Sequence, residues 1–395
     1  MDKPRIVVVD FGGQYTLLIA RAIRNLGVRP VVLSPEETDI LLKTYKPKGV
    51  ILSGGWSSIY SKDAPVLSRA VLDAHIPVLG ICLGMHWLAH MLGGTVESLP
   101  ARKEYGIRQF TRIVENDPLL RYLPDNSSVL ASHGDSVTVS PRGARHTGMT
   151  QACPISSFSI LKKNLFGVAF HPECNETEFG QQIFRNFLDI CGAENDWDPA
   201  DIVAQIRFNI VNTLPRKSRV LLLMSGGLDS TVVAAIAEPV LRERLICVMI
   251  DTGGLRADEM KEIRRNAVAA RCSFHVKYAK QEFLAALNGL IDEEEKHLAL
   301  QHVYESKVQE MKSIFGITHV IQETLASDMI KTGKKGNAAH IKTHHNVGVD
   351  SIAPLSDLFK DEVRDIARFL GFPVSDSQNH YGCDAPASAD CARLV

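Results

Sequence analysis

The residues with the clearest chemical potential are one cysteine, one histidine and one glutamate. Cys82 follows the apolar run Val78–Ile81, and His171-Pro172-Glu173 lies well downstream of it. A thiol with an ordinary pKa of about 8.5 is mostly protonated at neutral pH, so a catalytic cysteine needs a nearby imidazole or a helix amino terminus. Because His171 and Glu173 are two residues apart, an extended segment would place both side chains on one side and let the carboxylate orient the imidazole. The pattern therefore predicts that Cys82, His171 and Glu173 act together as nucleophile, base and orienting carboxylate.

Glycines surround this predicted nucleophile. Gly80 and Gly84 leave room for a sharp turn at Cys82, and the thiol would face the amino terminus of the helix that the turn opens. Backbone amides near the sulfur could stabilise an oxyanion, and the candidates are Gly54, Gly55 and Leu83. A cysteine taken at random is more often a buried core residue than a nucleophile, but the glycine-rich setting favours the nucleophile here.

A second chemical pattern, Ser225-Gly226-Gly227-Leu228-Asp229-Ser230-Thr231, follows an apolar strand and opens a helix. Successive backbone N–H groups and small hydroxyls at the positive end of a helix can surround an anion. The pattern is neither a Walker motif, which ends in Gly-Lys-Ser/Thr, nor a dinucleotide fingerprint. A turn that merely caps a helix is the alternative. The strand before it favours a phosphate-binding loop.

Length and composition indicate a globular protein with two domains. The chain has 395 residues, more than one ordinary domain needs, with 45% hydrophobic and 23% charged residues and a formal net charge of -1. Neither disorder nor a nucleic-acid partner is expected from these values. Ile6–Val9 reads as a strand from the start, without a secretory leader, so we expect a cytoplasmic protein with no membrane partner. Eight cysteines without paired or zinc-type spacing indicate free thiols in a reducing compartment.

Short β-branched runs alternate with longer amphipathic stretches, which is typical of parallel strands joined by helices. The fold class that we predict is α/β, with two doubly wound domains. The predicted strands are 6–10, 31–33, 49–52, 77–81, 219–224, 245–251 and 318–321, with shorter strands within 102–167. The predicted helices are 15–26, 179–191, 196–212, 258–270, 293–315 and 360–370. Both glycine-rich turns fall at carboxyl ends of strands, where ligands bind in open α/β sheets. The predicted divisions are a first domain at 1–193, a linker helix at 194–218, a second domain at 219–380 with a mobile basic lid at 331–346, and a tail at 381–395.

The first half resembles the class I glutamine amidotransferases, through Gly-Ile-Cys-Leu-Gly around Cys82, the glycine-rich loop before it and His-Pro-Glu after it. The resemblance spans residues 6–191 and implies a flavodoxin-like domain that releases ammonia from glutamine through a thioester on Cys82. Within the subgroup that makes GMP, Asp10–Thr16 matches the opening and Ser132–Asp135 the glutamine-holding segment. The implied glutamine-binding residues are Gly84, His86, Ser132, His133, Gly134 and Asp135. His86 stands where the family has glutamine, so a substrate contact and a structural histidine both remain open.

The second pattern resembles the PP-loop of ATP pyrophosphatases, which have an adenine nucleotide alpha hydrolase-like fold, cleave ATP between its α and β phosphates and transfer AMP to a carbonyl oxygen. Leu358–Arg364 matches a second phosphate segment of GMP synthetases. The resemblance implies that Lys360 neutralises pyrophosphate and that Asp229 and Glu362 hold Mg²⁺, which prefers oxygen ligands. The implied ATP-binding residues are Ser225, Gly226, Gly227, Asp229, Ser230, Thr231, Asp251 and Lys360. A lid at 341–348 would bring Lys342, His344 and His345 to the phosphates, unless these residues only form a solvated basic loop.

Nearly the whole chain therefore resembles glutamine-hydrolysing GMP synthetases, with the motifs in the same order. The chain stops at Val395, where that family continues into a dimerisation domain, and Asn379–Pro386 replaces the family's Arg-His-Pro-Phe-Pro-Gly-Pro-Gly. A further family segment, Gln-Gly-Thr-Ile-Tyr-Pro-Asp-Val-Ile-Glu, here carries Glu323 and Lys331 in place of its glycine and terminal glutamate, while Asp328 is kept. We interpret these changes as a remodelled acceptor pocket.

The function that we predict is glutamine hydrolysis coupled to ammonia transfer onto an ATP-adenylated carbonyl. The small-molecule acceptor would be XMP, a related heterocycle or a small carboxylate. Two alternatives remain. A PP-loop sulfur transferase could carry sulfur on Cys383 and Cys391, and a regulatory module could bind glutamine and ATP without catalysis.

Overall fold

The chain folds into two compact units, residues 1–197 and 198–395. The structure is a computed structural model that describes residues 5–255, 258–328 and 350–374. The predicted lid, with Lys331, Lys342, His344 and His345, lies outside the described residues, as does the predicted tail with Cys383 and Cys391.

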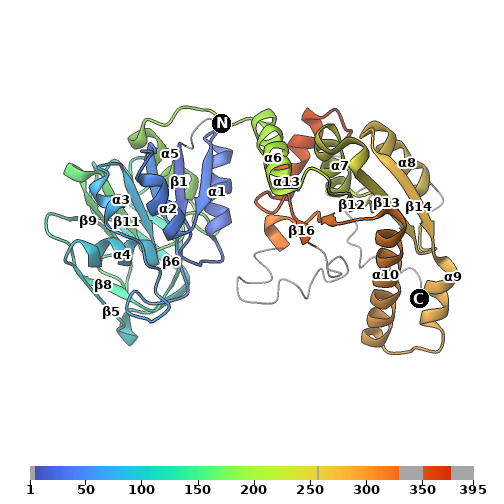
Figure 1. Cartoon of the computed structure of the whole chain (residues 1–395). Coiled ribbons are helices and arrows are strands. Elements are labelled where there is room, and N and C mark those ends of the chain that lie inside the picture. The colour runs from blue at the N-terminus through green and yellow to red at the C-terminus, as the bar shows by residue number, and fades with distance from the viewer. Residues whose placement is uncertain (1–4, 256–257, 329–349, 375–395) are drawn as a thin grey trace. The chain divides into compact units, whose positions relative to one another are not determined.

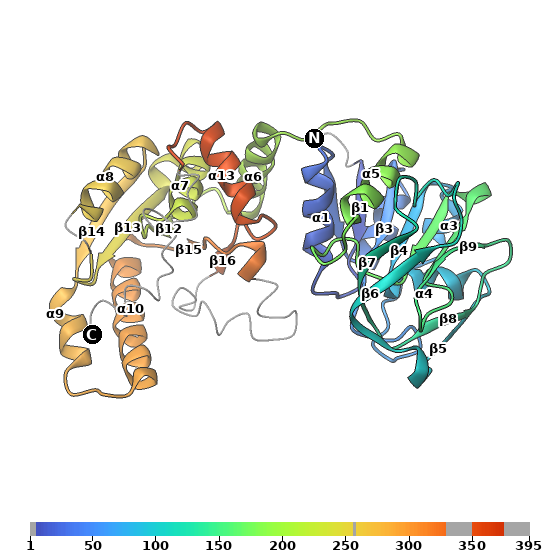
Figure 2. The same ribbon diagram turned by 180° about the vertical axis from the view of Figure 1, so that it is seen from behind.

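The first unit is built on a nine-stranded mixed sheet (Figures 1 and 2). Five parallel strands occur in the order β2 (Pro30–Leu33), β1 (Ile6–Val9), β3 (Gly49–Leu52), β4 (Val78–Ile81) and β11 (Leu165–Val168). Four antiparallel strands continue the sheet from β11, namely β10 (Ser157–Ile160), β9 (Arg145–Met149), β6 (Glu104–Arg112) and β7 (Asn126–His133). A separate pair joins β5 (Thr95–Glu97) to β8 (Ser136–Val139).

Helices cover both faces of this sheet, which explains why its central strands are apolar on both sides. Along β1, Ile6 and Val8 pack with the helices of one face, whereas Val7 and Val9 pack with those of the other. The first face carries α1 (Thr16–Asn25) and α5 (Gly180–Cys191), and the second carries α3 (Ala70–Asp73) and α4 (Leu83–Met91), with α2 (Pro35–Leu42) beside α3. A layered core of this kind holds the strand ends at fixed positions.

The second unit has a five-stranded parallel sheet. Its strand order is β14 (Ser273–Tyr278), β13 (Leu245–Asp251), β12 (Val220–Leu223), β15 (His319–Ile321) and β16 (Asp350–Ile352). The helices are α6 (Pro199–Thr213), α7 (Leu228–Leu241), α8 (Glu259–Ala269), α9 (Lys280–Leu287), α10 (Glu293–Phe315) and α13 (Lys360–Phe369). Short 3₁₀ turns occur at Pro100–Arg102 and Leu161–Lys163 in the first unit and at Arg242–Arg244 in the second.

Packing in this unit brings segments that are distant in sequence next to one another. Helix α13 packs against both α6 and α7, and α9 packs against α10 beside β13 and β14 (Figures 1 and 2). Leu221 and Val248 of the sheet and Val308 of α10 belong to one buried apolar cluster. The placement of α13 against α7 sets the geometry of the second candidate site.

The predicted fold class is confirmed, because both units are α/β structures with helices around largely parallel sheets. The predicted strands and helices recur within a few residues of their expected bounds; the long polar helix, for example, is α10. Cysteines within the described ranges are free thiols. In the same ranges, none of the helices has the length and apolar character needed to cross a bilayer.

Candidate active site

Cys82 lies at a strained turn between β4 and α4. Its backbone has φ 50 and ψ -108, a conformation that residues with a side chain rarely adopt, and the residue is 4% exposed. Two glycines make this turn sterically feasible. A Cβ on Gly84 would lie 2.3 Å from the Leu52 carbonyl oxygen, and one on Gly80 would lie 2.5 Å from the Gly84 backbone. Strain held in place by tight packing is typical of a functional position.

His171 reaches the same edge of the sheet because β11 lies next to β4. The Cys82 amide donates to Val168 O at 2.8 Å, so the chain that leaves β11 passes beside the nucleophile turn. The His171 amide then donates to Leu130 O of β7 at 2.9 Å. The His171 Nδ1 and Glu173 Oε1 atoms are 2.8 Å apart and both side chains are buried. The structure therefore brings the predicted cysteine, histidine and glutamate together.

The environment of His171 favours its protonated form. Burial acts to lower the pKa of this imidazole. The charge of Glu173 and the hydrogen bonds with Cys82 and Glu173 outweigh burial and raise the pKa well above its usual value. An imidazolium beside a thiol is an arrangement that supports a thiolate nucleophile. Glu173 thus acts on the histidine through both charge and orientation.

Two residues that the sequence analysis did not single out hold His171 in place. Thr177 Oγ1 donates to the His171 carbonyl oxygen at 2.6 Å and accepts from the Leu130 amide at 3.0 Å. The Tyr15 ring meets the imidazole edge-on, with the ring centroids 5.2 Å apart. Tyr15 stands within the opening segment that carried the family resemblance, whereas nothing in the sequence around Thr177 indicated its role.

The candidate oxyanion residues lie against this pair. A Cβ on Gly54 would be 2.9 Å from His171 Cε1 and 3.6 Å from Cys82 Cβ, and one on Gly55 would be 2.5 Å from Leu83 Cδ2. Ser53 Oγ accepts from the Phe11 amide and donates to Gly54 O, both at 2.9 Å, so the β1 and β3 turns are tied together. The predicted glycine loop is thus adjacent to Cys82 and His171.

The predicted glutamine-holding segment follows β7 on the other side of the thiol. Cys82 Sγ lies 3.6 Å from the Ser132 carbonyl oxygen, to which it donates. The His86 and His133 rings lie edge to face, 6.3 Å apart. Burial, together with His133, lowers the pKa of His86 to about 4, and Asp135 offsets part of this. His86 is therefore a neutral imidazole next to the segment that carries Ser132, His133 and Asp135, and Gly134 completes that segment.

In the second unit, the Ser225 loop forms a compact turn between β12 and α7. Gly226 has a φ of +85 and would clash with Ile263 at 2.3 Å if it carried a Cβ. Ser230 and Thr231 donate to Gly227 O at 3.0 and 2.9 Å. The Gly227 amide donates to Ser225 Oγ at 3.3 Å. The turn places backbone N–H groups at the positive end of a 14-residue helix, a geometry that suits an anion.

Two more predicted residues lie at the same edge of this sheet. Asp251 ends β13, which pairs with β12 on one side, and its Oδ1 accepts from the Gly253 amide at 2.9 Å. Glu323 follows β15, which pairs with β12 on the other side. Asp328 Oδ2 accepts from the Leu325 amide at 2.9 Å and so stabilises the turn after Glu323.

Lys360 joins the Ser225 loop although it is distant in sequence. Its Nζ lies 3.1 Å from both carboxylate oxygens of Asp229, in the first turn of α7. Glu362 Oε2 accepts from the Phe359 amide at 2.9 Å and caps α13. Lys360 and Asp229 therefore pair at the amino end of α7, whereas Glu362 caps the amino end of α13. That donor set suits a phosphate and a hard cation.

Comparison with known proteins identifies the family. Residues 7–191 match the family described as "Glutamine amidotransferase class-I", and residues 200–376 match "NAD synthase". A protein named GMP synthase [glutamine-hydrolyzing] from Syntrophomonas wolfei is 37% identical over 95% of this chain and 74% of its own length. The proteins of that name from Thermosipho melanesiensis and Aquifex aeolicus are 37% and 34% identical, over 95% and 96% of this chain and 75% and 76% of theirs. The chain belongs to the glutamine-hydrolysing GMP synthase family.

Membership in the GMP synthase family confirms the predicted resemblance and explains the two units. The amidotransferase match covers the nucleophile turn and the His171 segment, and the second match covers the Ser225 loop and α13. The alignment with a solved glutamine amidotransferase from Thermotoga maritima covers 48% of this chain and 82% of the solved chain, at 22% sequence identity and a TM-score of 0.39. The roles assigned to individual site residues remain predictions.

Proposed function

We propose that this GMP synthase family member is an ATP-dependent C–N ligase that takes its nitrogen from glutamine. Cys82 frees ammonia in the first unit, and the second unit activates a carbonyl oxygen of the acceptor with AMP. The observation that carries the proposal is the buried Cys82, His171 and Glu173 set at a strained turn. Free thiols among the described cysteines support a cytoplasmic location.

In the glutaminase step, the Cys82 thiolate attacks the side-chain amide carbon of glutamine. Backbone N–H groups of the Gly54, Gly55 and Leu83 region stabilise the oxyanion, and protonated His171 gives its proton to the leaving nitrogen. Ammonia departs and a thioester remains on Cys82. Water, deprotonated by His171, then hydrolyses the thioester to glutamate. Glu173 keeps the imidazole oriented throughout and stabilises it whenever it is protonated, as its 2.8 Å contact with Nδ1 supports.

In the ATP step, the amino end of α7 binds the phosphates that leave as pyrophosphate. The Ser225 loop supplies N–H groups and hydroxyls, Lys360 supplies positive charge, and Asp251 lies where the adenosine would be held. Asp229 and Glu362 offer the oxygen ligands that Mg²⁺ prefers, and the ion would neutralise charge on the phosphates. Since Lys360 contacts both oxygens of Asp229, the lysine and Mg²⁺ would share that carboxylate.

The acceptor is XMP, a related heterocycle or a small carboxylate. Glu323 adds negative charge after β15, the strand that pairs with β12, and Lys331 adds positive charge to the same segment of sequence. Ammonia made and used within one protein avoids dilution and protonation in bulk water. Such coupling requires that AMP formation depend on the acceptor.

The test is pyrophosphate release from ATP with XMP, other oxo-heterocycles and small carboxylates, each supplied with an ammonium salt. The proposal expects one class of acceptor to stimulate release and to yield AMP and an aminated product. A Glu323→Gly variant, which restores the family's residue, should shift the preference toward XMP if Glu323 remodels the pocket. Pyrophosphate release that no acceptor stimulates, or ATP cleavage to ADP, would refute the ligase proposal.

A further inference from the structure

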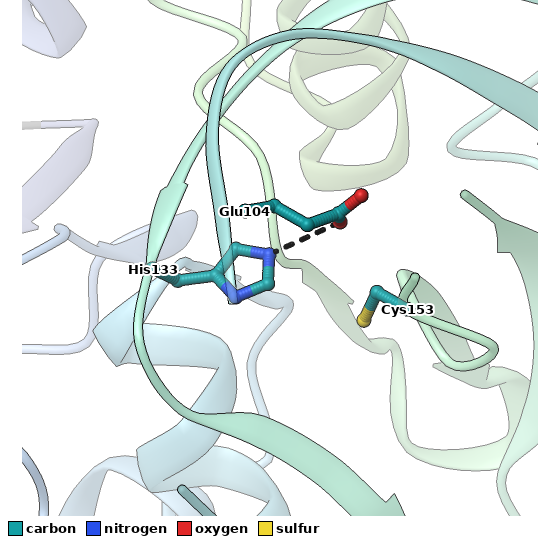
Figure 3. Close-up of side chains that lie close together, drawn as sticks. All are labelled: Glu104, His133 and Cys153. Carbon is teal, nitrogen blue, oxygen red and sulfur yellow. Dashed lines mark ion pairs between the residues drawn. The ribbon is translucent and has the colours of Figure 1, made fainter. Parts of the chain in front are cut away.

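Three buried side chains of the first unit converge at the edge of the predicted glutamine-holding segment, to which His133 belongs (Figure 3). Glu104 begins β6 and His133 ends β7, and the two are partners in the antiparallel register. Cys153 comes from the tight turn between β9 and β10, where the Thr150 amide donates to Cys153 O at 3.0 Å. Relative exposures are 1%, 4% and 0% for Glu104, His133 and Cys153. One ligand atom from each lies within 4.8 Å of the other two.

The polar atoms of this cluster are poorly satisfied by the protein. Neither ring nitrogen of His133 makes a hydrogen bond to any described residue, and Glu104 Oε1 makes none either, although it forms a longer ion pair with Arg108 Nε at 3.6 Å. The closest approach is 3.5 Å between His133 Nε2 and Glu104 Oε2. Buried polar groups without partners are costly and rare, so they indicate a missing ligand. Figure 3 shows the imidazole and the carboxylate facing each other, with the Cys153 sulfur nearby.

We propose that Glu104, His133 and Cys153 bind a divalent zinc ion. A thiolate, an imidazole and a carboxylate are the ligand types that Zn²⁺ takes in proteins, and three protein ligands leave one position for a solvent molecule. On binding, a zinc–sulfur bond forms and the thiol proton passes to solvent. The thiolate and the carboxylate together then neutralise the charge of the ion, which makes its burial favourable.

Thr150 provides the outer support that such sites need. Its Oγ1 donates to Glu104 Oε2 at 2.7 Å and accepts from the Cys153 amide at 3.1 Å. This hydroxyl thus fixes two of the three ligands. Outer groups of this kind orient metal ligands and contribute to affinity.

The first test uses full-chain protein carrying Cys82→Ser, because Cys82 is another thiol close to the Ser132–His133 segment. The protein is stripped with a chelator and titrated with Co²⁺, which reports thiolate ligation through a charge-transfer absorption. We expect one Co²⁺ per chain with that absorption, and its loss when Zn²⁺ is added. Adding Cys153→Ser should abolish the absorption, whereas Cys191→Ser, which removes a buried thiol of α5, should keep it. Absence of stoichiometric binding, or an absorption that survives Cys153→Ser, would overturn the site.

A second pair of variants keeps the proposal testable if Cys153→Ser does not fold. Thr150→Val should weaken Zn²⁺ binding by about 10- to 100-fold. Thr147→Val is the matched control, because Thr147 is equally buried but its hydroxyl pairs with Ser157 at 2.7 Å. Affinity is measured by competition with a zinc-binding dye, and circular dichroism confirms folding. Equal affinities for the two variants would show that Glu104 and His133 are only a structural pair.

Discussion

Thr177→Val tests the idea that backbone anchoring of His171 controls the glutaminase reaction. Thr177 is 5% exposed, and its hydroxyl is shared between the His171 carbonyl and the Leu130 amide. Valine has the same shape but no hydroxyl, so two buried backbone groups lose their partner. At about 1–3 kcal/mol for each of the two unsatisfied groups, the free energy of unfolding should fall by about 2–6 kcal/mol. The released segment also allows the imidazole to drift from the thiol.

The kinetic consequence should be confined to kcat. A misplacement of catalytic groups by less than 1 Å lowers kcat by about tenfold or more. The KM for glutamine should change little, because the Thr177 hydroxyl bonds to the backbone of Leu130 and His171 rather than to the Ser132–Asp135 segment. Glutamate release gives kcat and KM, and urea unfolding gives stability. Thr147→Val, which also removes a buried hydroxyl pair, should lose stability and keep kcat. Thr177→Ser should restore kcat. The reasoning fails if Thr177→Val turns over glutamine like the wild type.

Three further predictions concern the two candidate sites. Gly54→Ala places a Cβ 2.9 Å from His171 Cε1, so the imidazole must move by about half an ångström. The kcat for glutamine hydrolysis should then fall by about tenfold. Unchanged kinetics would refute the contact. Glu173→Gln should lower the pKa of His171, as an NMR titration of its ring proton would show. The raised pKa of His171 stabilises the folded protein fully at pH values below the unfolded pKa of about 6.5. This stabilisation is lost as the pH rises through the folded pKa. The wild type should therefore exceed Glu173→Gln in stability by the largest margin below about pH 6.5. A flat difference would contradict the charge argument. Asp229→Ala leaves Lys360 without a carboxylate that it contacts, and it should raise the Mg²⁺ concentration needed for pyrophosphate release; undiminished release at low Mg²⁺ would discredit the assignment.

The meeting of Cys82 with His171 could be predicted in part. Each residue follows an apolar run, and strand ends of a parallel sheet share an edge. The two-residue spacing of His171 and Glu173 predicted their contact in the same way. Sequence alone did not reveal that β11 lies beside β4, because the strands of 104–160 intervene between them in the chain. Family resemblance supplied that link.

Other features depend on packing that has no local signal. Lys360 meets Asp229 only because α13 packs on α7, and the sequence analysis assigned them to pyrophosphate and Mg²⁺ separately. The cluster of Glu104, His133 and Cys153 comes from three strands or turns, so no zinc-type spacing marks it in the sequence. Such sites arise from tertiary contacts and become visible once strand register is known.

Nitrogen transfer can be followed directly with glutamine labelled with ¹⁵N in its side-chain amide, together with ATP and the acceptor found by the screen that begins with XMP. Wild-type protein should form glutamate, AMP and pyrophosphate in equal amounts and place the label in the product. Cys82→Ala should form none of these from glutamine, yet should still make product, AMP and pyrophosphate when an ammonium salt is supplied. Labelled product from glutamine in the Cys82→Ala protein would contradict the account.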